Sequence, residues 1–356
     1  MKLGIFGFPQ VGKTSLFNLL TGTVAAARRA DPNVGVARVP DPRLDRLSGM
    51  FKPRKTTAAT FECVDIVGLH RGEAASSLNF AVLKPVDALA HVVRGFEDAA
   101  LAHSEGAIDA ARDVENMDME LIFADLDTVT KRVDRLKQNL TKMARPEDRK
   151  ELPLQERIKA WLESGKPIRE MELAVDEEKV LRGFAYYSAK PLLVLLNVGE
   201  ADVASLDTAL AGRGLAGLVG KPQVAALAVS LRIEMEMSQL PEKDAAAFRA
   251  DLGIAESALA RVLRGAFELL GLVSFYTVGE DECRAWPLRR GSPAVKAAGA
   301  IHTDIEKGFI RAEVTAYDRF LEAGSFPVAR DRGWFRLEGK EYVVQDGDIV
   351  HFRFAN

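Results

Sequence analysis

Short, nearly uninterrupted runs of apolar residues recur along the chain and predict the strands of a parallel sheet. A strand that is covered on both faces is apolar at almost every position, whereas a half-exposed strand alternates. Strands are predicted at residues 3–6, 60–68, 88–94, 191–197 and 224–230, and the last three of these runs fit the covered type. The segments between them are long enough to hold helices. Strands interleaved with helices predict an α/β fold, a doubly wound and mainly parallel sheet with its ligand at the carboxyl ends of the strands.

A different hydrophobic period interrupts this arrangement between the third and fourth runs. Apolar residues recur there at alternating steps of three and four, at Met119, Ile122, Leu126, Val129, Val133, Leu136, Leu140 and Met143. That spacing is a heptad seam. Pro146 and Pro153 are expected to break the helix, and residues 154–187 supply apolar partners for it. We predict an inserted antiparallel coiled-coil hairpin at 106–187; two ordinary surface helices would give the same pattern, but the length favours the hairpin.

The pattern changes again near the C-terminus. An amphipathic helix is predicted over residues 255–270, and from Phe275 onward aromatic and β-branched runs are separated by turns. These runs predict a small, largely β domain that also contains a helix followed by a strand at 301–314. The predicted domains are therefore 1–105 with 188–272, the hairpin at 106–187, and 273–356.

Composition narrows the class of protein. The chain has 356 residues, of which 47% are apolar, and it contains no apolar run of about 18 residues and no signal-peptide pattern at its start. Its two cysteines, Cys63 and Cys283, lie too far apart for a metal motif. We expect a cytoplasmic protein without a membrane partner. The net charge of -3 gives no overall basic footprint, so DNA is not an expected partner and any RNA contact would need a local patch.

The first run leads into a phosphate-binding motif. Residues 7–14 read Gly-Phe-Pro-Gln-Val-Gly-Lys-Thr and fit G-x-x-x-x-G-K-[ST], between a predicted strand and a predicted helix. Backbone N–H groups of such a loop wrap the phosphates, the lysine reaches the β- and γ-phosphates, and the hydroxyl can ligate Mg²⁺. A chance glycine turn is the alternative. The predicted phosphate-binding residues are Gly7, Gln10, Val11, Gly12, Lys13, Thr14 and Ser15.

A second motif follows at the end of the neighbouring strand, where Asp65 and Gly68 form Asp-x-x-Gly. In phosphate-loop enzymes a carboxylate in this position helps to hold Mg²⁺, and the glycine N–H can sense the γ-phosphate. We therefore predict Thr14 and Asp65 as metal ligands and Lys13 and Gly68 as residues that act on the γ-phosphate.

Together these motifs resemble one family, the Obg-like ATPases of the YchF type, a subfamily of the Obg GTPases. The resemblance rests on residues 7–14, 32–35, 39–45, 65–69, 92–98 and 197–200, and on the segments 284–286, 298–314 and 334–354. It covers essentially the whole chain. It implies a P-loop NTPase domain, an inserted helical hairpin and a C-terminal TGS domain of ubiquitin-like α+β fold. It also implies association with ribosomes or ribosomal RNA through the hairpin and the TGS domain.

The choice of base depends on Asn197-Val-Gly-Glu200. Guanine is usually read by Asn-Lys-x-Asp, whose aspartate accepts two hydrogen bonds from the base. Glutamate is longer by one methylene, which loosens that contact and no longer strongly excludes adenine. In the family this pattern goes with ATP, and the resemblance carries the role of base contact to Asn197, Val198, Glu200, Ser230 and Leu231.

Hydrolysis needs a group that orients the attacking water. The glutamine that orients water in Ras-like enzymes is replaced by Leu69. The resemblance implies that a histidine from another loop takes this role, and His103 stands about where that histidine does. A merely solvated His103 is the alternative, and His70 competes with it. Gln10 replaces an asparagine that can help to ligate a monovalent cation in the family, which leaves a dependence on K⁺ in doubt.

We therefore expect a Mg²⁺-dependent, ATP-preferring P-loop NTPase that works as a nucleotide-dependent switch. The alternatives are a guanine-specific Obg-type GTPase and a nucleotide-gated ribosome- or RNA-binding module with negligible hydrolysis. Basic residues of the C-terminal domain could contact phosphates, although a solvated face would have the same composition. They are Arg284, Arg289, Arg290, Lys296, Lys307, Arg311 and Arg353.

Overall fold

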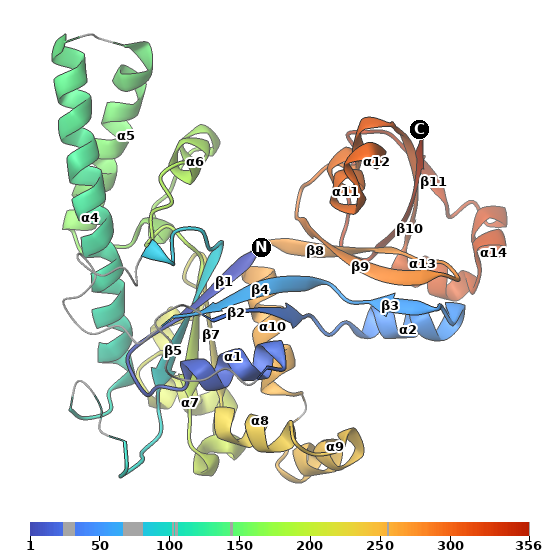
Figure 1. Ribbon diagram of the computed structural model, residues 1–356, viewed down its shortest axis with the longest axis horizontal. Coiled ribbons are helices and arrows are strands. Elements are labelled where there is room, and N and C mark those ends of the chain that lie inside the picture. Colours follow the sequence, from blue (N-terminus) through green and yellow to red (C-terminus); the bar gives the residue numbers. More distant parts are fainter. Residues whose placement is uncertain are drawn as a thin grey trace. The chain divides into compact units, whose positions relative to one another are not determined.

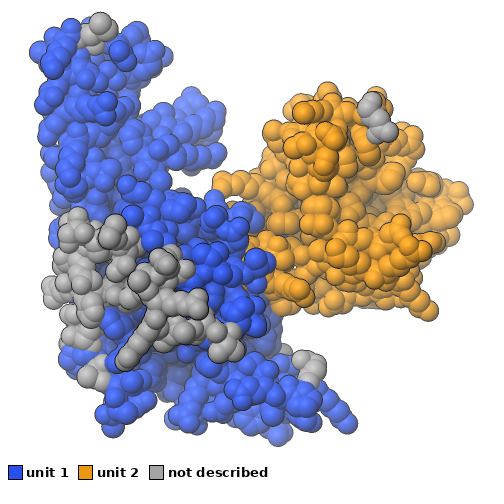
Figure 2. Space-filling view, viewed as in Figure 1, with its two compact units in different colours: residues 1–36, 62–269 blue, residues 37–61, 270–356 orange. Residues whose placement is uncertain are grey.

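The chain folds into two compact units, each of which is built from two stretches of sequence. The computed structural model describes residues 1–23, 33–66, 81–101, 103, 106–142, 145–254 and 256–355. The larger unit contains residues 1–36 and 62–269, and the smaller contains residues 37–61 and 270–356 (Figure 2).

The larger unit is organised around a six-stranded sheet with the order β2-β4-β1-β5-β6-β7 (Figure 1). Its strands are β1 (Lys2–Phe6), β2 (Asn33–Arg38), β4 (Thr60–Asp65), β5 (Ala88–Arg94), β6 (Leu192–Asn197) and β7 (Val224–Val229). The pairs from β4 through β7 are parallel. Ile5 lies opposite Asp65, and Asn197 lies between Arg94 and Val229. The predicted mainly parallel α/β sheet is confirmed, and its carboxyl ends gather the predicted motifs.

Helices cover this sheet and connect its strands. Helices α1 (Lys13–Thr21), α7 (Leu206–Gly212) and α10 (Ala258–Leu269) contact the strands. The unit also contains α6 (Val175–Arg182), α8 (Leu231–Met237), α9 (Glu242–Asp251) and short 3-10 turns at Ile168–Glu170, Glu200–Ser205 and Ala216–Leu218. In α10, Val262, Leu263 and Ala266 are fully buried against the sheet, and Gly271 follows with a φ of 63°. This is the predicted amphipathic helix with its glycine stop. Among the described helices, none has the length and apolar content needed to cross a bilayer.

The insertion contains two long helices, α4 (Ala110–Lys142) and α5 (Pro146–Glu163), which lie side by side (Figure 1). Ile122, Val129 and Val133 of α4 share a core with Leu154 and Ile158 of α5. Two ion pairs also join the helices, Arg132 with Glu151 (2.6 Å) and Lys137 with Glu156 (2.8 Å). The heptad positions from Met119 to Val133 thus pack against α5 and the chain that follows it.

One prediction about this insertion is wrong. Pro153 does not break the second helix but lies inside α5. A proline within a helix removes one backbone hydrogen bond and costs about 3 kcal/mol. Leu154, Ile158 and Leu162 are buried on one face of α5, and each buried leucine or isoleucine contributes about 1.5–3 kcal/mol. Their packing therefore outweighs the cost of the proline. Pro146 behaves as a helix boundary, because it is the first residue of α5.

The smaller unit has its own six-stranded sheet, with the order β11-β10-β12-β8-β9-β3. Its strands are β3 (Lys55–Thr57), β8 (Leu272–Thr277), β9 (Glu282–Arg289), β10 (Phe309–Ala316), β11 (Arg336–Glu338) and β12 (Asp348–Phe354). Its helices are α2 (Pro42–Phe51), α11 (Ala294–Ile301), α12 (Thr303–Lys307), α13 (Tyr317–Ala323) and α14 (Phe326–Asp331). Phe275, Trp286 and Phe352 pack in its core with the small side chains of α11. The unit is α+β, as the C-terminal pattern predicted.

The smaller unit is not the predicted segment 273–356 alone, because residues 37–61 belong to it as well. Strand β3 pairs in parallel with β9, and α2 packs against the same strand. Asp41 caps the N-terminus of α2 and accepts a hydrogen bond from the Tyr276 hydroxyl (2.5 Å). Arg43 pairs with Asp346 (2.7 Å). Long-range pairing of this kind leaves no local sequence signal.

Candidate functional site

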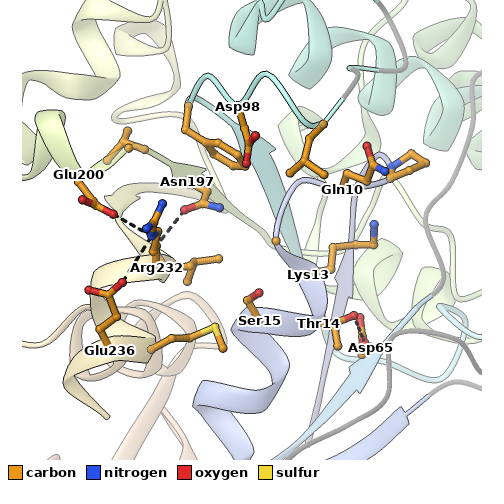
Figure 3. Close-up of a pocket in the computed structure, with 18 of the residues that line it drawn as sticks. Gln10, Lys13, Thr14, Ser15, Asp65, Asp98, Asn197, Glu200, Arg232 and Glu236 are labelled. Atoms are coloured by element: carbon orange, nitrogen blue, oxygen red, sulfur yellow. Dashed lines mark hydrogen bonds and ion pairs between the residues drawn. The ribbon is translucent and has the colours of Figure 1, made fainter. Parts of the chain in front are cut away.

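A cavity of about 950 Å³ lies at the carboxyl ends of the strands in the larger unit (Figure 3). It is lined by the loop after β1, the ends of β4 and β6, the loop after β5, and α8. The lining residues are Pro9, Gln10, Gly12, Lys13, Thr14, Ser15, Asn33, Asp65, Ile66, Phe96, Glu97, Asp98, Leu101, Asn197, Val198, Gly199, Glu200, Leu231, Arg232, Met235, Glu236 and Gln239. Most of the residues predicted for phosphate, metal and base contact thus meet in one place.

The loop between β1 and α1 needs glycine at two points. Gly12 precedes α1 with a φ of 108°, and a Cβ atom there would lie 2.7 Å from Asn197 Nδ2. Gly7 has a φ of 143°, and a Cβ atom there would lie 2.5 Å from the Val92 carbonyl oxygen. Only glycine adopts such angles without strain. The first backbone N–H groups of α1 have no intrahelical partners, so Thr14 and Ser15 offer N–H donors at the cavity.

Lys13 brings a buried cation to the same loop. Its side chain is 7% exposed, and its Nζ donates to the carbonyl of Phe8 at 2.6 Å. Burial lowers the pKa of Lys13 to about 8, and the nearby Asp65 carboxylate opposes that shift. Since desolvation makes this charge costly, a phosphate anion beside Lys13 would be strongly favoured.

Thr14, Asn33 and Asp65 form a small polar cluster beside Lys13. Thr14 Oγ1 donates to Asp65 Oδ2 at 3.0 Å, and Asn33 Nδ2 donates to the same oxygen at 3.3 Å. Asp65 Oδ1 is buried and has no hydrogen-bond partner within the described ranges. Burial raises the pKa of Asp65, and the Thr14 and Asn33 hydrogen bonds and Lys13 oppose the rise.

These oxygens fit a magnesium ion. Mg²⁺ prefers oxygen ligands and usually takes only one or two from the protein, the rest coming from water and phosphate. The described residues contain no cluster of three or more His, Cys, Asp or Glu side chains suited to a metal. The Thr14 hydroxyl and the Asp65 carboxylate, whose Oδ1 is buried and unpartnered among the described residues, are the oxygen ligands that such an ion would take here.

Asn197 joins the phosphate-side loop to α8. Its Nδ2 donates to the carbonyl of Val11 (3.0 Å), and its Oδ1 accepts from the backbone N–H of Leu231 (3.1 Å). The side chain is 6% exposed, so both bonds are shielded from water. Ser230 and Leu231 form the N-cap and first residue of α8.

Glu200 already has a partner at the far end of the cavity. Arg232 Nε lies 2.8 Å from Glu200 Oε1 and 3.4 Å from Glu236 Oε1 (Figure 3). Sequence reasoning missed Arg232, Met235, Glu236 and Gln239. Their spacing along residues 231–239 is that of one helical face, and this signal could have found them.

Other predicted residues lie away from the cavity lining or outside the described part of the chain. Gly7, Val11 and Ser230 do not line the cavity. His103 Nε2 lies 2.9 Å from Asp113 Oδ2 at the start of α4, and its side chain is 3% exposed. Gly68 and His70 lie outside the described residues. Catalytic roles for His103, Lys13 and Gly68 stay predictions.

Two family models match the chain. One, described as a 50S ribosome-binding GTPase, matches residues 2–150. The other, YchF-GTPase_C, described as a protein of unknown function, matches residues 272–355. The first match falls in the larger unit apart from residues 37–61, and the second lies within the smaller unit.

Relatives match over nearly the whole length. The ribosome-binding ATPase YchF of Bacillus subtilis is 38% identical over 366 residues, and that of Haemophilus ducreyi is 40% identical over 362; each alignment covers 99% of both chains. A solved structure, the YchF GTPase of Schizosaccharomyces pombe, matches with a TM-score of 0.86 at 28% identity, covering 99% of this chain and 97% of the other.

Proposed function

The chain belongs to the YchF family of Obg-like ATPases, and on that premise we propose that it hydrolyses ATP to ADP and phosphate as a nucleotide-dependent switch on ribosomes. The observation that carries the proposal is the arrangement of one cavity. The glycine-lysine loop and the Thr14–Asp65 oxygen pair lie at one end, and the loop that we propose to read the base lies at the other (Figure 3).

The phosphate end of the cavity supports transfer of the γ-phosphate of ATP to water. Lys13 and the N–H groups of Thr14 and Ser15 would bind the β- and γ-phosphates. Thr14 and Asp65 would hold Mg²⁺, which supplies positive charge to the phosphate oxygens as negative charge moves to the leaving group. In this scheme the protein supplies position and charge, and no covalent intermediate on the chain is needed.

The base end decides between ATP and GTP. The relatives' printed names differ on this point, since those from bacteria read ATPase and the yeast structure reads GTPase. Glutamate at position 200 and its ion pair with Arg232 favour ATP, because a guanine-reading carboxylate has to be available to the base. A guanine-specific GTPase is the second candidate.

Water activation is proposed for His103, with Gly68 sensing the γ-phosphate. In the structure, the imidazole lies beside Asp113 of α4. It would therefore have to leave that carboxylate to reach a water molecule near the γ-phosphate. Slow turnover without a partner is what this arrangement favours.

A ribosome is the proposed partner, and the cytoplasm the proposed location. Relatives are named for ribosome binding, and the hairpin and the smaller unit, proposed as a TGS domain, are the parts available for it. Of the basic residues predicted there, Lys296 pairs with Glu306, Arg353 pairs with Glu313, and Arg284 lies over the Trp286 ring. Phosphate contacts from Lys296 and Arg353 would compete with these pairs, and ribosome affinity should fall steeply with salt.

Titration with labelled ATP and GTP in the presence of Mg²⁺ tests nucleotide binding and the base. We expect ATP to bind more tightly, and Lys13→Ala to abolish binding of both. A GTP preference of about tenfold, or 1.4 kcal/mol, would reject the ATP assignment.

Single-turnover phosphate release tests hydrolysis. We expect His103→Ala to release phosphate more slowly than the wild type with unchanged ATP affinity. Rates near zero for both proteins, with and without ribosomes, would favour a binding module instead. An equal but substantial rate would clear His103 of the role.

A further inference from the structure

Arg232 forms an ion pair with Glu200, the carboxylate that the sequence motif assigns to base recognition. It is the second residue of α8, and its Nε lies 2.8 Å from Glu200 Oε1. Glu236, one helical turn further on, lies 3.4 Å from the same Nε. All three side chains line the cavity, and Figure 3 shows the arginine between the two glutamates. Glu200 therefore already has a cationic partner.

The position of this pair is fixed by buried contacts rather than by the exposed charges. Asn197 accepts a hydrogen bond from Leu231 N–H (3.1 Å), which anchors the start of α8 next to the loop after β6. Arg232 follows Leu231 directly, and Glu200 follows Asn197 by three residues. Since Asn197 is buried, α8 presents Arg232 to Glu200 in a set register.

We infer that Arg232 determines the base specificity of this site, by holding Glu200 in an ion pair that denies it to guanine. The inference rests on the proposed nucleotide binding. Guanine presents two N–H donors, N1–H and N2–H₂, and needs a carboxylate that can accept both. Guanine would have to displace Arg232 to obtain it.

Adenine makes no such demand. N1 of adenine is a hydrogen-bond acceptor, so an unpaired carboxylate beside it would repel that edge of the base. A carboxylate that is paired with arginine would repel it less. Removing Arg232 leaves Glu200 as an acceptor without its cation, which favours the donor edge of guanine and disfavours adenine. The ATP preference is thus a property of the Glu200–Arg232 pair rather than of glutamate alone.

The expected change in nucleotide preference is limited because the Glu200–Arg232 ion pair is exposed to solvent. The Arg232 and Glu200 side chains are 76% and 49% exposed, and ion pairs open to water are weak and screened by salt. We expect Arg232→Ala to raise the affinity for GTP relative to ATP by about threefold to tenfold; tenfold corresponds to 1.4 kcal/mol.

The experiment measures dissociation constants of ATP and GTP, with Mg²⁺, for the wild type and Arg232→Ala. The readout is the ratio of the two constants. Removing a positive charge from the protein changes its affinity for the phosphates of ATP and of GTP equally, so that change cancels in the ratio. Arg213→Ala is the matched control: Arg213 also pairs with a carboxylate, Asp202 at 3.1 Å, but does not line the cavity. Its ratio should equal that of the wild type.

Two further measurements show whether Arg232 acts through Glu200. The double variant Arg232→Ala with Glu200→Gln should lose the gain for GTP, because the freed carboxylate is gone. Raising the salt concentration should shift the wild-type ratio toward GTP and leave the ratio of Arg232→Ala unchanged, because only the wild type has the screened pair.

The inference would be overturned by an unchanged ratio in Arg232→Ala, or by a gain for GTP that survives in the double variant. In either case ATP binding by the wild type would still support the proposed function. Loss of ATP affinity in Arg232→Ala with no gain for GTP would also overturn it, since Arg232 would then contact the nucleotide itself. A wild type that binds neither nucleotide would reject the proposed function, and the inference with it.

Discussion

Asn197 connects the two ends of the cavity through one buried side chain. Its amide donates to the carbonyl of Val11 in the phosphate loop and accepts from the N–H of Leu231 at the start of α8. Both ends of a bound nucleotide would therefore depend on this one buried side chain in the cavity wall.

Replacing this residue tests the connection. Asn197→Ala leaves a buried carbonyl and a buried N–H without partners, each of which costs about 1–3 kcal/mol. We expect a loss of ATP affinity of at least tenfold, measured by equilibrium binding. Asn139→Ala is the control, because Asn139 bonds Asp148 within the hairpin and lies outside the cavity. Equal ATP affinity in the two variants would contradict the role.

At this scale the sequence reveals residues that belong to a local motif. Lys13, Thr14 and Asp65 follow strands whose carboxyl ends meet, so their proximity could be predicted. Local spacing could place Arg232 on the helical face shared by residues 231–239, but it could not predict the partner of that side chain. Its contact with Glu200 depends on the direction in which α8 leaves β7, and the Asn197 hydrogen bond to Leu231 sets that direction.

At the scale of elements, one buried carboxylate ties the hairpin to the sheet domain. Asp125 of α4 accepts hydrogen bonds from the backbone N–H groups of Tyr187 (2.8 Å) and Ser188 (2.7 Å), which lead into β6. Burial raises the pKa of Asp125 to about 6, and these hydrogen bonds and Lys190 oppose the rise. The helix is thus held where the inserted chain returns to the sheet.

The raised pKa gives a pH dependence with a definite sign. The folded chain binds this proton more tightly than the unfolded chain, so the associated stability is present at low pH and is lost as the pH rises through about 6. Relative to Asp125→Asn, the wild type should gain about 1 kcal/mol of unfolding free energy between pH 7 and pH 5. Fluorescence of Trp161 measures this transition in a background that lacks Trp286 and Trp334, which lie in residues 270–356. A difference that is constant with pH would contradict the assignment.

Most helices and strands of the larger unit can be predicted from the sequence. Helix α5 is the exception, because it continues through Pro153. Hydrophobic period reports which face of a helix will be buried, and α4 and α5 follow it. The rule that proline ends a helix is local, and it fails where a long buried face, here Leu154 and Ile158, compensates for one missing hydrogen bond.

At the scale of the whole molecule, residues 37–61 leave the larger unit between two strands of its sheet and complete the smaller unit. Leu44 and Leu47 of α2 are 2% and 0% exposed there. Leu47→Ala should therefore lower the unfolding free energy of the smaller unit by about 2–5 kcal/mol. Fluorescence of Trp286 and Trp334, in a Trp161→Phe background, measures this transition.

Met50→Ala provides the comparison, since Met50 lies in the same helix but is 36% exposed, and it should change little. The transition reported by Trp161, in a background that lacks the other two tryptophans, should stay unchanged for Leu47→Ala. If that transition moved instead, residues 37–61 would belong energetically to the larger unit.

A unit assembled from two distant stretches of chain cannot be exchanged between relatives as one cassette. A chimera that received residues 270–356 alone would set a foreign β9 beside the resident β3, and a foreign counterpart of Tyr276 beside the resident Asp41. Recombination that preserves this protein therefore needs two coordinated breakpoints, so the segment at 37–61 and the C-terminal stretch should be inherited together.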